Sequence, residues 1–178
     1  MQHLVSSTIQ VSGGENKPIV LPKPAPKKPY FGEGSFTDEL KVRWNDYYED
    51  VAVLAFPTPL GDVQIEDIDE KALYYRAPYT SAKDVKQFLP SLANYREPQK
   101  DAVIAKNEIM DVTRFLKPDG TLDWKVPAGK WTIMRLGSRN NGAVTRPAPA
   151  PGLGFEADKM DTTAINAHME NFTGKLFK

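Results

Sequence analysis

The sequence predicts a mainly β fold: an antiparallel β-sandwich with a proline-rich N-terminal loop and a C-terminal α-helix. Three observations lead to this prediction. Alternating apolar and polar residues occupy positions 5–11, a continuous apolar run occupies 51–56, and short turns containing glycine or proline separate further alternating segments after residue 109. Helical spacing of apolar residues over a long segment is found only after Asp161.

The N-terminal part of the chain combines a strand pattern with a long loop pattern. Residues 5–11 predict a half-buried strand, which Gly13 and Gly14 end. Five prolines between residues 17 and 29 are incompatible with regular strand pairing and favour an extended, polyproline-like crossing. We therefore expect an extended loop over residues 22–46.

The middle of the chain predicts a buried strand followed by less regular structure. Val51–Phe56 is uniformly apolar and is bounded by Pro57, as expected for a central strand that is covered on both faces. Residues 65–77 predict one or two strands. Residues 81–89 have the pattern of a short capped helix, which Pro90 limits to a turn or two.

After Lys100 the pattern becomes a meander of short strands. Pro118-Asp119-Gly120 predicts a tight turn, since proline presets φ and glycine tolerates positive φ, and residues 127–129 predict a second turn. Two short turns between alternating segments imply antiparallel pairing. The expected strand segments are 103–105, 109–115, 122–126 and 131–136.

The last 18 residues predict the long helix. Asp161 is placed to cap it, and the helix should run from Thr162 to about Lys175, with Gly174 weakening its last turn. This divides the chain into a β-sandwich domain at 1–160 and a helix at 161–178. The helix carries one apolar face, made of Ile165, His168, Met169, Phe172 and Leu176.

Composition narrows the functional classes. The chain has 178 residues, of which 40% are hydrophobic and 26% charged, with 23 basic and 23 acidic residues. A neutral chain without a basic stripe is not expected to bind nucleic acid. Because it has no cysteine, it cannot form a disulfide framework, and His3 and His168 lack the spacing of metal ligands. No segment is long and apolar enough to predict a membrane span.

Four stretches of the chain resemble glycoside hydrolase family 106, the α-L-rhamnosidase-like enzymes of bacterial polysaccharide degradation. They occur in the family's order, so the resemblance covers nearly the whole chain. The stretches are DVAVLAFPTP (50–59), KALYYRAPYTS (71–81), IMDVTRFLKPDGTLDWKVPAGKWTI (109–133) and WTIMRLGSRNNGAVTRPAPAPGLGFEADKMD (131–161).

The resemblance implies that the chain is one part of a larger enzyme. Family members are multidomain proteins built around a (β/α)-barrel, whereas 178 residues hold about one ordinary domain. We therefore expect a truncated piece, namely the non-catalytic β-sandwich portion, which contributes structure and one wall of the sugar cleft. The helix at 161–178 would lead into the missing barrel. The alternative is a self-standing carbohydrate-binding or protein-interaction module.

The chemistry implied by the resemblance is inverting hydrolysis by two carboxyl groups, about 6.5 to 9.5 Å apart. In the family these groups lie on barrel strands, the first shortly after the position of Lys178, so no catalytic residue is carried over. No cofactor is expected in this chain, although calcium would help to hold the sugar in the complete enzyme. The parent enzyme is expected to be periplasmic or secreted, and residues 1–14 do not resemble a signal peptide.

The expected substrate-binding residues are Glu156, Asp158 and Lys159 of the GLGFEADKMD stretch, together with Arg139. The family commonly has cysteine where this chain has Ala157. Charged side chains of this kind bind sugar hydroxyls strongly and directionally. The alternative, which the residues themselves favour, is that Asp158 and Lys159 pair with each other or with the following helix.

Three further possibilities are weaker. Asn141-Gly142 is first a turn signal, and the aromatic residues are more often core than sugar-stacking surfaces, with Trp44 and Tyr79 the best stacking candidates because both adjoin loops. Acidic residues at 66–70 are more often a solvated edge than a calcium site.

Carbohydrate is the expected partner, and the apolar face of the C-terminal helix suggests a homo-oligomer.

Overall fold

The structure is a computed structural model of the chain, and it divides into two compact units, Met1–Pro57 with Ile109–Lys178 and Thr58–Glu108. The strands expected at 65–77 and the short helix expected at 81–89 lie outside the described residues, apart from Glu66. The described residues are 2–14, 17–27, 33–34, 36–61, 66, 95, 97–145, 148 and 152–177.

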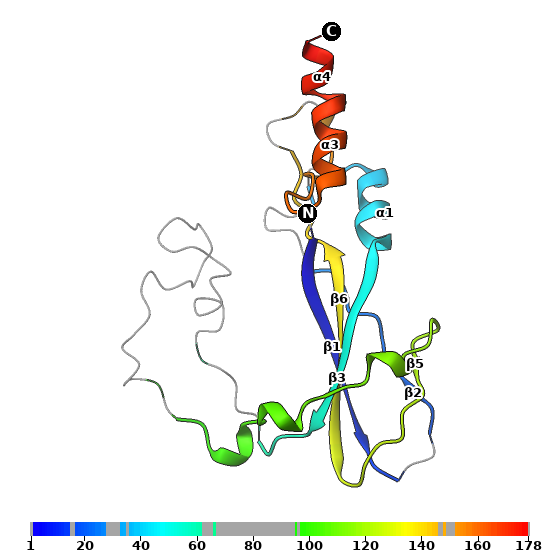
Figure 1. Cartoon of the computed structure of the whole chain (residues 1–178), viewed down its shortest axis with the longest axis vertical. Coiled ribbons are helices and arrows are strands. Elements are labelled where there is room, and N and C mark those ends of the chain that lie inside the picture. The colour runs from blue at the N-terminus through cyan, green and yellow to red at the C-terminus, as the bar shows by residue number, and fades with distance from the viewer. Residues whose placement is uncertain are drawn as a thin grey trace. The chain divides into compact units, whose positions relative to one another are not determined.

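The first unit is built on a four-stranded antiparallel sheet with the strand order β1-β6-β3-β4 (Figure 1). β6 is bonded to β1 along its whole length without a change of register, and to β3 on its other side. The expected strand at 51–56 is part of β3, which is an interior strand, but it is not covered on both faces: Val53 and Ala55 are buried, whereas Val51 is 52% exposed. The strand bounds are β1 Gln2–Ser12, β3 Tyr48–Pro57, β4 Met110–Asp111 and β6 Lys130–Asn140.

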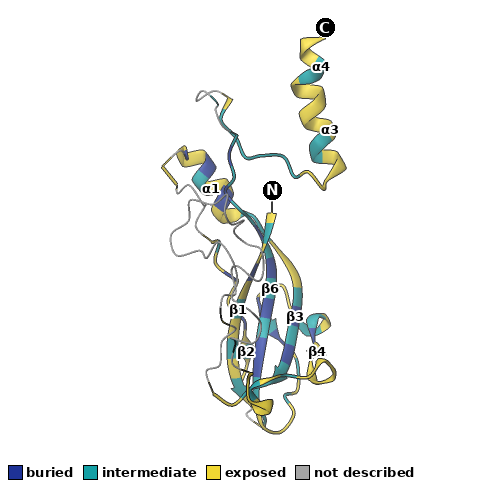
Figure 2. Ribbon diagram, turned by 90° about the vertical axis from the view of Figure 1, so that its left-hand side faces the viewer, coloured by how far each residue is buried: buried dark blue, intermediate teal, exposed yellow. Residues whose placement is uncertain are grey.

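One face of this sheet, called the inner face below, carries the main core. A second, two-stranded antiparallel sheet of β2 (Ile19–Val20) and β5 (Thr121–Leu122) contributes to that core. Figure 2 shows buried positions along β6 and β3. The predicted mainly β class with antiparallel pairing is confirmed. The buried core residues are Leu21, Val53, Ala55, Val112, Leu122 and Ile133.

The register of β3 on β6 changes by one residue between Asp50 and Ala52. Val51 is the extra residue of this β-bulge, and it is 52% exposed. Before the bulge Asp50 lies opposite Gly137, and after it Val53 lies opposite Arg135.

The expected meander is present only at its first turn. Across residues 118–120 the chain pairs antiparallel through a bridge between Leu116 and Leu122, and the Lys117 amide donates to the Thr121 carbonyl at 2.8 Å. The second expected pair is wrong: β5 pairs with β2 on its other side, and residues 124–126 form no strand, since both edges of β6 are already occupied by β1 and β3. Across the turn at Pro127, the rings of Trp124 and Trp131 meet edge to face with centroids 5.6 Å apart. Packing of aromatic rings thus replaces a hydrogen-bonded ladder.

The expected strands at 103–105 and 109–115 are also wrong in extent. The first contains no strand, and the second contains only β4, followed by the 3₁₀ helix η4 (Thr113–Phe115). The Asp111 carboxylate accepts hydrogen bonds from the Thr113 amide (2.9 Å) and hydroxyl (2.6 Å). These local side-chain bonds end the strand by offering the backbone an alternative to the ladder. Two further 3₁₀ helices are η2 (Lys100–Ala102) and η3 (Lys106–Glu108).

The loop expected at 22–46 contains a helix, α1 (Asp38–Asp46). The Thr37 hydroxyl caps it by accepting a hydrogen bond from the Leu40 amide at 3.3 Å. Leu40 and Trp44 are buried on one side of α1 in a second cluster, with Phe36 and Val144. The capping threonine, two acidic residues in the first turn and apolar residues four apart all predict this helix, but the proline-rich stretch before it obscures the pattern.

The predicted C-terminal helix is present as α3 (Thr162–Asn171) and α4 (Thr173–Leu176). Asp161 caps α3 by accepting a hydrogen bond from the Thr163 amide at 2.8 Å, as predicted. No residue of either helix is buried, and Phe172 and Leu176 are 62% and 71% exposed. The apolar face is therefore left largely in solvent by the described residues (Figure 2).

Candidate functional site

The expected site residues fall into two environments, one exposed and one buried. Glu156, Asp158 and Lys159 lie on the segment that leads into α3, at or near the surface. Arg139 is only 7% exposed and lies near the end of β6.

The backbone that carries the exposed group is held in place by pairing and packing. The Thr145 amide donates to the Gly154 carbonyl and the Glu156 amide donates to the Ala143 carbonyl, each at 2.9 Å. Between these bonds, the Phe155 ring meets Phe36 edge to face at 5.7 Å, within the second cluster. Glu156 and the residues after it are thus presented from a defined position.

The three charged side chains do not pair in the expected way. Lys159 Nζ lies 3.8 Å from Glu156 Oε2, and the Lys159 side chain is 71% exposed. Asp158 instead accepts a hydrogen bond from the Met160 amide at 3.0 Å, in the turn before α3. An exposed pair of this kind contributes little to stability, typically less than about 1 kcal/mol. A carboxylate and an ammonium group held side by side have the chemistry to bind neighbouring sugar hydroxyls.

Arg139 is placed as an internal anchor. Its Nε donates to the Pro24 carbonyl at 3.0 Å, and its Nη1 donates to the carbonyls of Asn45 (2.6 Å) and Tyr47 (3.1 Å). The guanidinium carbon lies 4.8 Å from the centroid of the Tyr48 ring. These contacts tie the proline-rich segment and the end of α1 to the sheet, so a structural role accounts for the burial of Arg139.

A partly buried ionic network beside Arg139 was not predicted. Arg135 is 2% exposed, and its Nε and Nη2 donate to the two carboxylate oxygens of Asp50 at 2.7 and 2.8 Å. Its Nη1 donates to the Leu21 carbonyl at 2.7 Å. The Tyr48 hydroxyl donates to Asp50 Oδ1 at 2.5 Å, and a Cβ added at Gly137 would overlap the Tyr48 ring.

The electrostatics of this network favour its ionised form. The hydrogen bonds from Arg135 hold the pKa of Asp50 below its usual value, against the opposing effect of burial. Burial, followed by the hydrogen bond to Asp50, raises the pKa of Tyr48 to about 12. Asp50 therefore remains a carboxylate and Tyr48 a hydrogen-bond donor at neutral pH. The signal in the sequence was the alternation of β6, which places Arg135 and Arg139 on the same face as Ile133.

The weaker candidates have mixed outcomes. Trp44 is 5% exposed and its Nε1 donates to the Asn140 carbonyl at 3.0 Å, so it is a core residue; Tyr79 lies outside the described residues. The predicted turn at Asn141-Gly142 is confirmed by the φ of +73° at Gly142 and by a 2.9 Å bond from the Ala143 amide to Asn141 Oδ1. Of the acidic run only Glu66 is described.

The described part of the chain holds neither a cluster of metal ligands nor a helix suited to cross a membrane. Within it, no three histidine, cysteine or acidic side chains gather as metal ligands. No described helix has the length and apolar character that a membrane crossing requires.

Comparison with known proteins identifies the family. The family model described as alpha-L-rhamnosidase, of glycoside hydrolase family 106, matches residues 1–178. The chain belongs to this family. A protein of Formosa agariphila named "Putative beta-glucuronidase" is 38% identical over 170 residues, which are 96% of this chain and 12% of that protein.

A solved structure shares the fold of the family 106 chain. The rhamnosidase from Novosphingobium sp. PP1Y aligns with a TM-score of 0.59 at 19% identity, over 97% of this chain and 27% of that one. The chain thus spans about an eighth of the one relative and about a quarter of the other.

Proposed function

We propose that the chain is the non-catalytic, β-rich portion of a glycoside hydrolase related to α-L-rhamnosidases, and that Glu156, Asp158 and Lys159 line one wall of its sugar cleft. The observation that carries the proposal is the match of the whole chain to the family, combined with its small share of the relatives' length.

The pKa values of the described carboxyl groups support a non-catalytic role. A glycosidase acid needs a raised pKa so that it still holds a proton at working pH. Three described carboxyl groups have a pKa that departs from the usual value, and in all three it is lowered. Hydrogen bonds from Arg135 lower the pKa of Asp50. Hydrogen bonds from Thr113 and Thr121 lower the pKa of Asp111 and of Asp119, respectively. These groups are held as carboxylates, and each already accepts hydrogen bonds from neighbouring groups of the fold.

The location of Glu156–Lys159 supports the cleft wall. The segment is fixed by backbone bonds and by Phe155, yet its charged groups reach solvent. A complete sugar site buries most of its ligand, and one wall cannot do so alone. We therefore expect the isolated chain to bind sugar weakly.

The test has two parts. Purified chain is first assayed on 4-nitrophenyl α-L-rhamnoside, with and without calcium, and we expect no turnover above buffer. Turnover that Glu156→Gln or Asp158→Asn abolishes would contradict the non-catalytic role.

The second part is an NMR titration with L-rhamnose. We expect shifts at the amides of Glu156 and Lys159, with a Kd weaker than about 1 mM, which corresponds to about 4 kcal/mol of binding free energy. The matched control is the Lys117–Asp123 pair, another exposed lysine and carboxylate, 3.1 Å apart, in a different part of the chain. Equal shifts at both pairs would contradict a specific sugar site at Glu156–Lys159. Tight binding that Lys159→Met abolishes would instead favour the self-standing carbohydrate-binding module.

A further inference from the structure

The outer edge of β1 exposes a row of backbone hydrogen-bonding groups. β1 is the terminal strand of the sheet and is bonded to β6 alone among the described strands. The Gly13 amide donates to the Gly129 carbonyl, in register with the β1–β6 ladder, so odd-numbered residues of β1 direct their N–H and C=O groups toward β6. The even-numbered residues direct theirs away from the sheet. All of them, Gln2, Leu4, Ser6, Thr8, Gln10 and Ser12, are exposed.

This edge lacks the features that usually protect a free strand. Natural edges are kept short, bulged, charged or interrupted by proline. β1 has 11 residues and no proline, aspartate, glutamate, lysine or arginine, and its pairing with β6 has no register shift. At the opposite side of the sheet, β4 has only two residues and ends at Asp111. The two edges of one sheet are therefore treated differently, and only β1 is suited to accept another strand.

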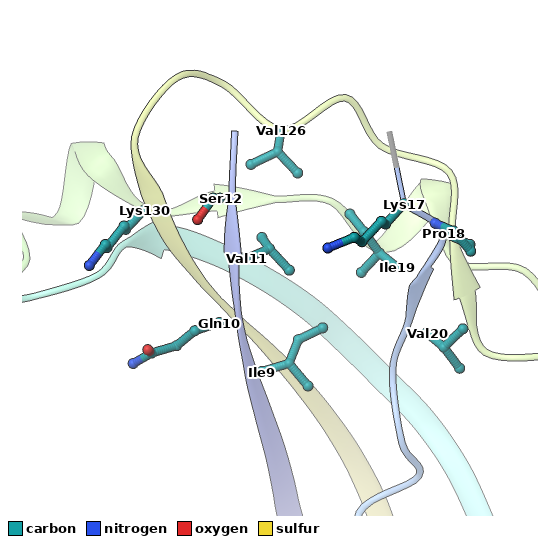
Figure 3. Close-up of a pocket in the computed structure, with 10 residues that line it drawn as sticks. All are labelled: Ile9, Gln10, Val11, Ser12, Lys17, Pro18, Ile19, Val20, Val126 and Lys130. Carbon is teal, nitrogen blue, oxygen red and sulfur yellow. The ribbon is translucent and has the colours of Figure 1, made fainter. Parts of the chain in front are cut away.

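A hollow of about 500 Å³ separates Ile9–Ser12 of β1 from Lys17–Val20. Figure 3 shows Ile9, Val11 and Val126 around this space, with β1 and β2 on either side of it.

We propose that this edge pairs with the same edge of a second copy of the chain, antiparallel, about a two-fold axis at Thr8. The outward groups are on even-numbered residues, so an antiparallel pair centred there places Leu4 opposite Ser12, Ser6 opposite Gln10, and Thr8 opposite Thr8. No charged group is opposed to another in this register, and directly opposed threonines are a favourable cross-strand pair.

The choice of a second copy rests on this self-complementarity. A two-fold contact uses the same surface on both copies, so it closes at a dimer and leaves no further β1 edge to extend the sheet. Pairing with a strand of another protein would not require β1 to be complementary to itself. Pairing with a second copy does require it.

The test is solution mass by light scattering during size-exclusion chromatography. The chain should elute at about twice the 19.9 kDa monomer mass. Thr8→Lys and Thr8→Glu should each give monomer, because the new charge faces its own copy across the axis. An equimolar mixture of the two should regain the dimer. Thr8→Val, which keeps a β-branched residue without charge, is the matched control and should stay dimeric.

The charge-swap mixture makes the test specific to the register. Thr8 is exposed, so each variant should keep the circular dichroism spectrum of the folded parent. A parent chain that is monomeric up to high concentration overturns the proposal, as does a mixture that stays monomeric. A dimer that survives Thr8→Lys but is lost in Phe172→Asp would place the interface on the exposed C-terminal helix instead.

Discussion

The inner face of the sheet has two halves that are held in different ways. In the apolar half, Val53, Ala55 and Ile133 pack on Leu122 of the small sheet and have no exposed surface themselves. In the arginine half, the neighbouring inward positions of β6 are Arg135, Gly137 and Arg139. Tyr48 and Asp50 of β3 contact them.

The difference follows from what covers each half. Proline has no N–H and cannot build a ladder, yet the carbonyls of a proline-rich segment still need donors when they are buried. Arg135 and Arg139 donate to the carbonyls of Leu21 and Pro24. The two guanidinium groups thus donate the hydrogen bonds that backbone amides donate in a regular strand pair. A buried arginine on a strand can therefore be required by the proline-rich segment that crosses the strand, whose carbonyl groups need hydrogen-bond donors.

The largest expected effect is in the apolar half. Ile133→Ala should lower the free energy of unfolding by about 4 kcal/mol, since Ile133 is fully buried and the neighbouring strands limit collapse of the cavity. Urea denaturation measures the change. Leu4→Ala, on the exposed face and 57% exposed, should change it by less than about 0.5 kcal/mol. Equal losses in both variants would show that Ile133 does not belong to the core.

Asp50→Asn tests the arginine half, with an expected loss of about 2 kcal/mol. Breaking a buried pair costs about 3 to 5 kcal/mol, and the 35% exposure of the Asp50 side chain reduces that figure. Because the folded-state pKa of Asp50 is lowered, its contribution is present above about pH 4 and is lost as the pH falls through the folded-state pKa. The two proteins should therefore converge in stability in acid. Glu49→Gln, at an exposed neighbouring position, is the matched control and should change the free energy of unfolding by less than about 0.5 kcal/mol at neutral pH.

His3 offers a smaller test at the end of the arginine half. Its Nε2 is buried with no hydrogen-bond partner among the described residues, and burial, aided by Lys27, lowers its pKa. The unfolded chain then binds the proton more readily, so stability should fall as the pH drops below about 6.5, toward the folded-state pKa. His3→Leu should remove this pH dependence and add about 1 kcal/mol at pH 5. His168→Leu, on the exposed helix, should leave the dependence in place.

The smallest expected effect is on the C-terminal helix. Phe172→Asp should change the free energy of unfolding by less than about 0.5 kcal/mol, because Phe172 is 62% exposed. Thermal unfolding monitored by the tryptophan fluorescence of the sheet measures this. A loss comparable with that of Ile133→Ala would mean that the helix packs on the sheet in solution.

The sequence predicted what depends on local patterns. The mainly β class, the interior strand at 51–56 and the helix capped by Asp161 followed from alternation, apolar runs and capping chemistry. Distant pairing partners did not follow: the turn at Pro118-Gly120 and the bridge of Leu116 to Leu122 across it are local, but β5 also pairs with β2, which is about 100 residues away. Strand partners depend on which edges are free in three dimensions.

The candidate site was predicted unevenly for the same reason. Glu156 and Lys159 stand three residues apart, and their contact is local. The partners of Arg139 are near residues 24 and 45, and no spacing in the sequence points to them. The Asp50–Arg135 pair spans 85 residues and was missed altogether.

The bulge at Val51 shifts the phase of β3. Tyr48 and Asp50, at even positions, face the same way as Val53 and Ala55, at odd positions, only because one additional residue separates the two pairs. Deleting Val51 would restore strict period two and force the strand to present either its ionic or its apolar pair inward. A single unpaired residue, 52% exposed and without a contact of its own in the core, thereby allows one strand to serve two kinds of interior.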